Sequence, residues 1–90
     1  MFEILEQLMK TIRDRKNASS DSSYTNKLLN DKNLSVAKVK EEIAELIEAV
    51  EKDTNKIHEA ADVIYHLMVY LEANNIKIED IMKELKKRQK

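Results

Sequence analysis

The 90-residue sequence contains no glycine, no proline, no cysteine and no tryptophan. Average usage would place roughly six glycines and four or five prolines in a chain of this length. Glycine-rich phosphate loops, dinucleotide-binding turns and nucleophile elbows all need glycine backbone geometry, so these sites are excluded. Without cysteine there is no disulfide, thiolate metal site or cysteine nucleophile, which fits a protein of the reducing cytoplasm.

An excess of one charge and a long apolar run are also missing. The 16 basic and 17 acidic residues leave a net charge of −1, so no basic field is available for a nucleic-acid backbone. No run approaches the roughly 18 apolar residues of a membrane span, and no segment resembles a signal peptide. We therefore expect a soluble cytoplasmic protein that binds neither nucleic acid nor membranes.

Hydrophobic residues make up 42% of the chain, which is too many for a disordered protein. Because glycine and proline are absent and apolar residues recur at helical spacing, the sequence predicts an all-α bundle of four to five helices. The predicted helices are residues 2–16, a short segment from Tyr24 capped by Ser22 or Ser23, a long helix capped by Asn33 or Ser35, residues 55–73, and a last helix from about Ile78 that ends before the tail 86–90. Asn74 and Asn75 are predicted to provide the left-handed end of the fourth helix.

The chain contains no internal repeat and no long linker, so residues 1–90 are expected to form one domain. The long helix carries apolar residues at alternating threes and fours from Val36 to Val50, and this stripe is predicted to be buried. A single copy of so short a chain buries only a modest fraction of its surface. We therefore expect a homodimer in which the two subunits complete each other's bundle.

Four acidic residues on two helices form the pattern most informative about chemistry. Glu42 and Glu45 lie three residues apart and face the same way beside the apolar stripe. Glu59 and Asp62 lie on a narrow strip of a helix that is otherwise apolar around most of its circumference. Buried carboxylates must be paired or bound to metal. If the two helices pack together, the four converge on a site suited to Mg²⁺ or Mn²⁺, which in turn bind phosphate oxygens.

A simpler interpretation is that these acids pair with lysines such as Lys38 and Lys56, or face the solvent. His66 extends the acidic strip of the second helix, and from the sequence it is equally well a structural residue. His58, near the start of that helix, is expected on the surface. The sequence alone leaves these alternatives open.

Several of these segments together resemble a known family. They are Arg15-Lys16, Ser23-Tyr24-Thr25, Lys38-Val39-x-Glu41-Glu42-x-x-Glu45 and Glu59-Ala-Ala-Asp62-Val-Ile-Tyr65-His66. In this order and spacing they resemble the MazG-like all-α nucleoside triphosphate pyrophosphohydrolases, and more narrowly the phosphoribosyl-ATP pyrophosphohydrolase family. The resemblance covers nearly the whole chain. Lys40 departs from it, because the family usually has glycine before the paired glutamates.

The resemblance implies a nucleotide-binding hydrolase that converts N1-phosphoribosyl-ATP to phosphoribosyl-AMP and pyrophosphate, the second step of histidine biosynthesis. Mg²⁺, or alternatively Mn²⁺, would be held by Glu42, Glu45, Glu59 and Asp62, with Glu41 or Glu42 as the general base. The remaining implied contacts to phosphate and substrate are Arg15, Lys16, Ser23, Tyr24, Thr25, Lys27, Lys38 and His66.

Two other functions are compatible with parts of the pattern. A relative that hydrolyses ordinary or damaged deoxynucleoside triphosphates would share the acidic motif without needing Tyr65-His66 or Ser23-Tyr24-Thr25. A helical dimerisation module without catalytic activity would use the acids only for solubility. That last interpretation leaves Glu59 and Asp62 on a largely apolar helix unexplained.

Overall fold

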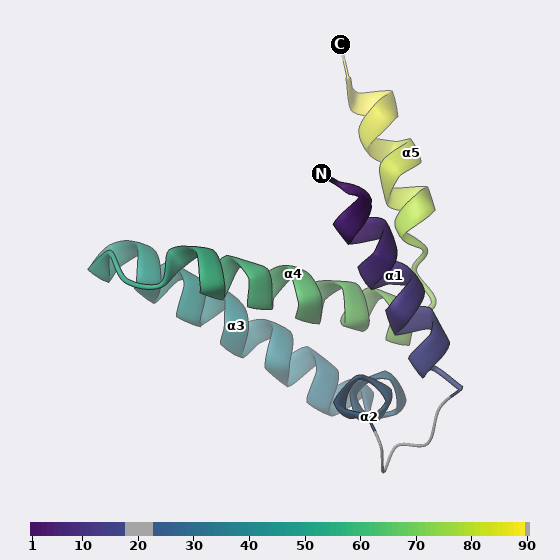
Figure 1. Cartoon of the computed structure of the whole chain (residues 1–90), viewed down its shortest axis with the longest axis horizontal. Coiled ribbons are helices and arrows are strands. Elements are labelled where there is room, and N and C mark those ends of the chain that lie inside the picture. Colours follow the sequence, from purple (N-terminus) through teal and green to yellow (C-terminus); the bar gives the residue numbers. More distant parts are fainter. Residues whose placement is uncertain (18–22, 90) are drawn as a thin grey trace.

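The computed structural model describes residues 1–17 and 23–89, and every regular element in these ranges is a helix. The helices are α1 (Glu3–Arg15), α2 (Tyr24–Asn30), α3 (Lys32–Lys52), α4 (Lys56–Ala73) and α5 (Ile78–Arg88). The predicted all-α class is therefore confirmed. Figure 1 shows α3 and α4 as an antiparallel hairpin, with α2 beside the start of α3 and with α1 and α5 projecting beside the C-terminal end of α4, at the same open end of the hairpin. Both described chain ends lie on that projecting pair.

Short polar side chains set the beginnings of α2 and α3. The Ser23 hydroxyl accepts a hydrogen bond from the Asn26 amide, so Ser23, one of the two predicted caps, caps α2. The prediction for α3 was wrong, because its cap is Asp31, whose carboxylate accepts from the Leu34 amide at 3.0 Å. Only this one residue separates α2 from α3, so the long helix begins before the predicted caps. Residues 18–22, which include the alternative cap at position 22, lie outside the described residues.

The two long helices end at residues in the left-handed backbone conformation, and neither residue is glycine. Asp53 at the end of α3 has φ 54°, and Asn75 after α4 has φ 59°. Aspartate and asparagine tolerate this conformation better than other non-glycine residues. The prediction holds for Asn75 but was wrong for Asn74, whose φ is −104° and whose side chain donates to the Tyr70 carbonyl at 2.8 Å.

The last helix is longer than predicted and includes most of the basic tail. It continues to Arg88, because lysine and arginine are good helix formers and their charges favour the C-terminal end of the helix dipole. Glu79 and Asp80 occupy its first turn, where the dipole favours negative charge. No helix in the described ranges is long and apolar enough to cross a membrane.

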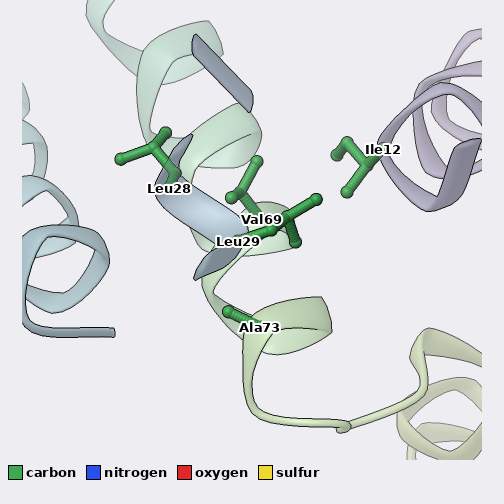
Figure 2. Packing of buried hydrophobic residues seen from close by; sticks show 5 residues of the cluster. All are labelled: Ile12, Leu28, Leu29, Val69 and Ala73. Atoms are coloured by element: carbon green, nitrogen blue, oxygen red, sulfur yellow. The ribbon is translucent and has the colours of Figure 1, made fainter. Parts of the chain in front are cut away.

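The hydrophobic core lies where α1 and α2 meet the C-terminal half of α4. Figure 2 shows Ile12 of α1, Leu28 and Leu29 of α2, and Val69 and Ala73 of α4 packed together. Each fully buried aliphatic side chain in such a cluster contributes about 1.5–3 kcal/mol to folding. This cluster holds α2 against α4, and it leaves the N-terminal half of α4 to pack against α3.

The apolar stripe of α3 is only partly covered within one chain, which differs from the prediction of a buried stripe. Val36, Val39 and Leu46 are half-buried, whereas Ile43, Ile47 and Val50 are exposed. The residues of α3 that are buried are instead Ser35, Glu42 and Ala49. The stripe is therefore rotated partly away from α4, because α4 packs against the flank of α3 that carries the acidic residues.

Candidate functional site

The helical hairpin of α3 and α4 brings the predicted acidic residues together. Carboxylate oxygens of Glu42, Glu45 and Glu59 lie within 4.8 Å of one another. Ligand atoms of His58, Glu59 and Asp62 form a second group within the same limit. Because Glu59 belongs to both groups, the four carboxylates form one continuous acidic cluster across the two helices.

Two oxygens of this cluster are buried without any partner. Glu42 is only 8% exposed, and its Oε2 atom and that of Glu59 have no hydrogen-bond partner among the described residues. Burial, together with the charge of the neighbouring Glu45, raises the pKa of both carboxyl groups above its usual value. Leaving buried carboxylate oxygens unpaired is costly. A divalent cation, which prefers oxygen ligands of this kind, would remove that cost.

The lysines that could have neutralised the cluster are engaged elsewhere. Lys38 lies 3.2 Å from the exposed Glu41, three residues away on the same helix, and Lys56 pairs with Asp53. Among the described residues, no ion pair joins a lysine or arginine to Glu42, Glu45 or Glu59. The interpretation in which Lys38 and Lys56 pair with the four acids is therefore not what the structure shows.

Asp62 has a partner, His58, that the sequence analysis did not connect with the site. The exposed His58, one turn earlier on α4, places Nε2 3.3 Å from the Asp62 carboxylate. His58 is on the surface, as predicted, but its spacing of four residues from Asp62 was the signal that links it to the site. It joins the edge of the acidic cluster that faces the solvent.

Tyrosine and histidine side chains adjoin the acidic cluster from α2 and α4. The Tyr24 hydroxyl lies 3.3 Å from Nε2 of the buried His66, whose Nδ1 lies 2.9 Å from the carbonyl oxygen of Asp62. The hydroxyls of Thr25 and Tyr65 form a second hydrogen bond between the same helices. The structure thus brings the Ser-Tyr-Thr segment and the Tyr-His pair together beside the acids.

The other residues implied by the resemblance lie in different surroundings. Lys16 lies 3.7 Å from Glu72 and 3.2 Å from the Asn75 side chain, at the opposite end of α4 from Glu59. Thirteen residues of helix separate Glu59 from Glu72, a distance of about 20 Å. Arg15 and Lys27 are exposed, and Lys40 is exposed on α3. Within one chain, Lys16 is therefore not brought to the acidic cluster.

A polar residue that the sequence analysis missed fixes α1 against α2. Asn26 is only 1% exposed, and its side-chain amide donates to the carbonyl oxygens of Arg15 and Lys16. These carbonyls end α1 and have no partner within that helix. The asparagine is positioned by α2 next to the capping Ser23, so it sets where the first helix ends relative to the site.

The fold and the site define an all-α protein with a carboxylate cluster between two antiparallel helices. A family model described as phosphoribosyl-ATP pyrophosphohydrolase matches residues 5–89. The chain belongs to the phosphoribosyl-ATP pyrophosphohydrolase family.

Curated relatives support the same assignment. The phosphoribosyl-ATP pyrophosphatase of Clostridium acetobutylicum is 52% identical, over 96% of this chain and 81% of the relative. That of Clostridium novyi is 45% identical, over 99% of this chain and 84% of the relative. A histidine biosynthesis trifunctional protein of Candida albicans is 40% identical over 90% of this chain, which corresponds to 10% of that protein. No solved structure matches the chain.

Proposed function

We propose that this protein hydrolyses phosphoribosyl-ATP to phosphoribosyl-AMP and pyrophosphate in the cytoplasm, as the second step of histidine biosynthesis. Membership of the family and the names of the relatives support this reaction. The structural observation that carries the proposal is the pair of buried, unpartnered oxygens of Glu42 and Glu59 within an acidic cluster. These carboxylates would hold a divalent cation, which would supply positive charge for the triphosphate of the substrate.

Glu42, Glu45, Glu59 and Asp62 are the residues that would hold Mg²⁺, or alternatively Mn²⁺. Their grouping and the two unpartnered oxygens fit a hard divalent cation. When bound, the cation supplies charge neutralisation for the phosphate oxygens of the substrate. The protein's own contribution is to hold these ligands on two packed helices before the substrate arrives.

Glu42 is the better suited of the two candidate general bases. The Glu42 carboxylate lies in the acidic cluster and its Oε2 atom has no partner among the described residues, so it can accept a proton from a water molecule held there. Glu41 is exposed and holds Lys38. In the proposed step, a water molecule gives a proton to the Glu42 carboxylate, and the oxygen of that water bonds to the α-phosphorus. The bond between the α-phosphorus and the bridging oxygen breaks, and pyrophosphate leaves with that oxygen.

Phosphate binding is proposed for the basic residues around the cluster. Lys38 lies one turn before Glu41 and Glu42 on α3, and its amino group is 3.2 Å from the Glu41 carboxylate. Arg15 and Lys27 remain proposed phosphate contacts, as do the hydroxyls of the Ser23-Tyr24-Thr25 segment for the substrate, whereas Lys16 is left out because it lies at the opposite end of α4 from Glu59.

A homodimer completes the proposal. Ile43, Ile47 and Val50 form an exposed apolar stripe on α3, and Ile64 and Leu67 are exposed on α4. Contiguous apolar surfaces of this kind on a small protein are typical of an interface. Covering them with a second copy supplies the burial that a 90-residue chain lacks.

Pyrophosphate release is the direct test of the reaction. The purified protein is incubated with Mg²⁺ and phosphoribosyl-ATP, and in parallel with each common deoxynucleoside triphosphate. We expect release from phosphoribosyl-ATP, and none when Mg²⁺ is replaced by a chelator. Release from deoxynucleoside triphosphates alone would favour the alternative function, hydrolysis of ordinary or damaged deoxynucleoside triphosphates. Absence of Mg²⁺ and Mn²⁺ binding at millimolar concentrations would favour a non-catalytic helical module.

A further inference from the structure

The hydrogen bonds around His66 have a defined direction. Its Nδ1 atom lies 2.9 Å from the carbonyl oxygen of Asp62, and a carbonyl oxygen can only accept. Nδ1 therefore carries the ring proton, and in the neutral imidazole Nε2 presents a lone pair. The Tyr24 hydroxyl lies 3.3 Å from that Nε2 atom, so it must donate. The backbone of α4 thus determines the direction of a hydrogen bond made by a side chain of α2.

The surroundings hold the imidazole ring in place. His66 is buried, and the ring of Tyr65 meets it edge-on with centroids 4.9 Å apart. The Tyr24 ring also meets it edge-on, at 6.1 Å. A ring that meets two tyrosine rings and is tied to its own helix cannot turn to exchange its two nitrogens without breaking these contacts.

Tyr24 itself is open to a ligand. Its side chain is 49% exposed, although its hydroxyl points to the buried histidine. Burial raises the pKa of this hydroxyl and outweighs the opposing charge of Lys38, so the phenol keeps its proton at neutral pH. Its proton is committed to His66, and only its lone pairs remain for a neighbour.

We infer that His66 is a positioning residue that makes Tyr24 a hydrogen-bond acceptor toward the substrate. An acceptor at this position fits a hydroxyl or amino group of the ribosyl or adenine parts, and it does not fit a phosphate oxygen, which also accepts. Tyr24 therefore discriminates for the nucleoside portion of the substrate, whereas the phosphates are left to the cation and the lysines. This inference rests on the proposed reaction for its kinetic consequences only.

The ring nitrogens can be examined without any activity. The protein has two histidines, so ¹⁵N-labelled imidazole spectra of the wild type and of His58→Asn assign His66 directly. We expect a protonated Nδ1 and an unprotonated Nε2 at neutral pH. In Tyr24→Phe the Nε2 resonance should shift toward that of a free, unbonded nitrogen. A protonated Nε2, or a resonance unaffected by Tyr24→Phe, would overturn the inference.

Kinetics with phosphoribosyl-ATP test the role of the pair. Tyr24→Phe and His66→Asn should each raise KM about three- to tenfold, the effect of one hydrogen bond, with a smaller change in kcat. The double variant should be no worse than either single variant. His66→Gln should restore much of the loss, because glutamine can place an acceptor near the position of Nε2, whereas asparagine replaces only Nδ1. The constant for inhibition by pyrophosphate, which has no nucleoside, should not change in Tyr24→Phe.

Other kinetic outcomes separate the failure of the inference from that of the proposed reaction. Multiplicative effects of the two substitutions, or weaker pyrophosphate inhibition in Tyr24→Phe, would show that Tyr24 contacts phosphate or acts independently of His66. Melting temperatures of the variants identify any that fail to fold. Tyr24→Phe removes only a hydroxyl group at a half-exposed site, so this variant should fold and can be tested even if the His66 variants do not. A wild-type protein inactive on phosphoribosyl-ATP would reject the proposed reaction, and the imidazole spectra would still decide the hydrogen-bond direction.

Discussion

The guanidinium of Arg13 on α1 binds the carboxylate of Glu79 on α5 through two parallel hydrogen bonds. Nη1 lies 2.8 Å from Oε2, and Nη2 lies 2.6 Å from Oε1. The Nε atom of the same guanidinium lies 3.5 Å from Glu72 on α4. Arg13 lowers the pKa of Glu79 to about 2. One arginine thus connects the first and last helices to the end of α4, and two-point pairing fixes their relative angle.

Removing this ion pair should lower the free energy of unfolding at neutral pH and not at low pH. Because the folded-state pKa of Glu79 lies below its ordinary value of 4.5, the stabilisation is present above about pH 4.5 and is lost as the pH falls toward 2. Glu79→Gln should therefore unfold at lower urea than the wild type at pH 7, with the difference vanishing near pH 2. Urea titrations across this range measure it. The control is Glu84→Gln, which alters only a 3.7 Å pair within α5. A difference that persists at pH 2 would contradict the assignment.

Glu59→Gln should have opposite effects on stability with and without the cation. Burial and Glu45 raise the pKa of Glu59, so its ionised form at pH 7 opposes folding when no cation is bound. We expect the variant to melt at the same or a higher temperature than the wild type in chelator. In Mg²⁺ the wild type should gain melting temperature, whereas the variant should bind Mg²⁺ about tenfold or more weakly and lose hydrolysis. Melting curves with increasing Mg²⁺ measure both effects.

Glu51→Gln is the matched control for this experiment. Glu51 is exposed on the same helical hairpin and lies outside both groups of clustered ligands. It should leave the response to Mg²⁺ and the hydrolysis of phosphoribosyl-ATP unchanged. A Glu59→Gln protein with the full response to Mg²⁺ would show that this carboxylate is not a ligand.

Asn26→Leu should destabilise the fold because it removes the buried amide that satisfies the end of α1. The substitution keeps a similar size but leaves the carbonyls of Arg15 and Lys16 without their partner. We expect a loss of about 2 kcal/mol in the free energy of unfolding. Urea denaturation measures this, with the exposed Asn33→Ala on α3 as the control. Equal stabilities of the two variants would mean that water replaces the asparagine without cost.

Ile47→Lys should dissociate the proposed homodimer without unfolding the chain. Ile47 is 54% exposed in the single chain, so a lysine fits there, but an interface covering this position would have to bury its charge. We expect the dissociation constant to rise at least about tenfold. Sedimentation velocity over a range of concentrations measures it, with Glu48→Lys, at an exposed position on a different face of α3, as the control. A wild type that sediments as a monomer at micromolar concentration would reject the homodimer itself.

The helices and their approximate limits could be predicted because the signals are local. Periodic apolar residues, a serine before α2, and the polar break at 53–55 each act over a few residues. The start of α3 was misplaced because Asp31, Asn33 and Ser35 are all residue types that can cap a helix. Which of them does so depends on where α2 ends, and the packing of α2 on α4 decides that.

For the candidate site, the sequence supplied the residue types and their spacing along each helix. It could not show that Lys38 turns to Glu41 and Lys56 to Asp53, since both lysines have several acids within reach. Nor could it show the unpartnered oxygens of Glu42 and Glu59 or the hydrogen bond from Tyr24 to His66, because these depend on contacts between helices.

The sequence by itself determined the helical class, the family, and the two acidic pairs at fixed helical spacing. The class and the acidic pairs follow from composition and from local geometry, because side chains three and four residues apart on a helix face the same way, whereas the family follows from the resemblance of the motifs. The tertiary structure decided which flank of α3 meets α4. That choice buries Glu42 beside Glu59 and leaves Ile47 exposed, because the two residues lie on different faces of α3 and only one of these faces packs against α4.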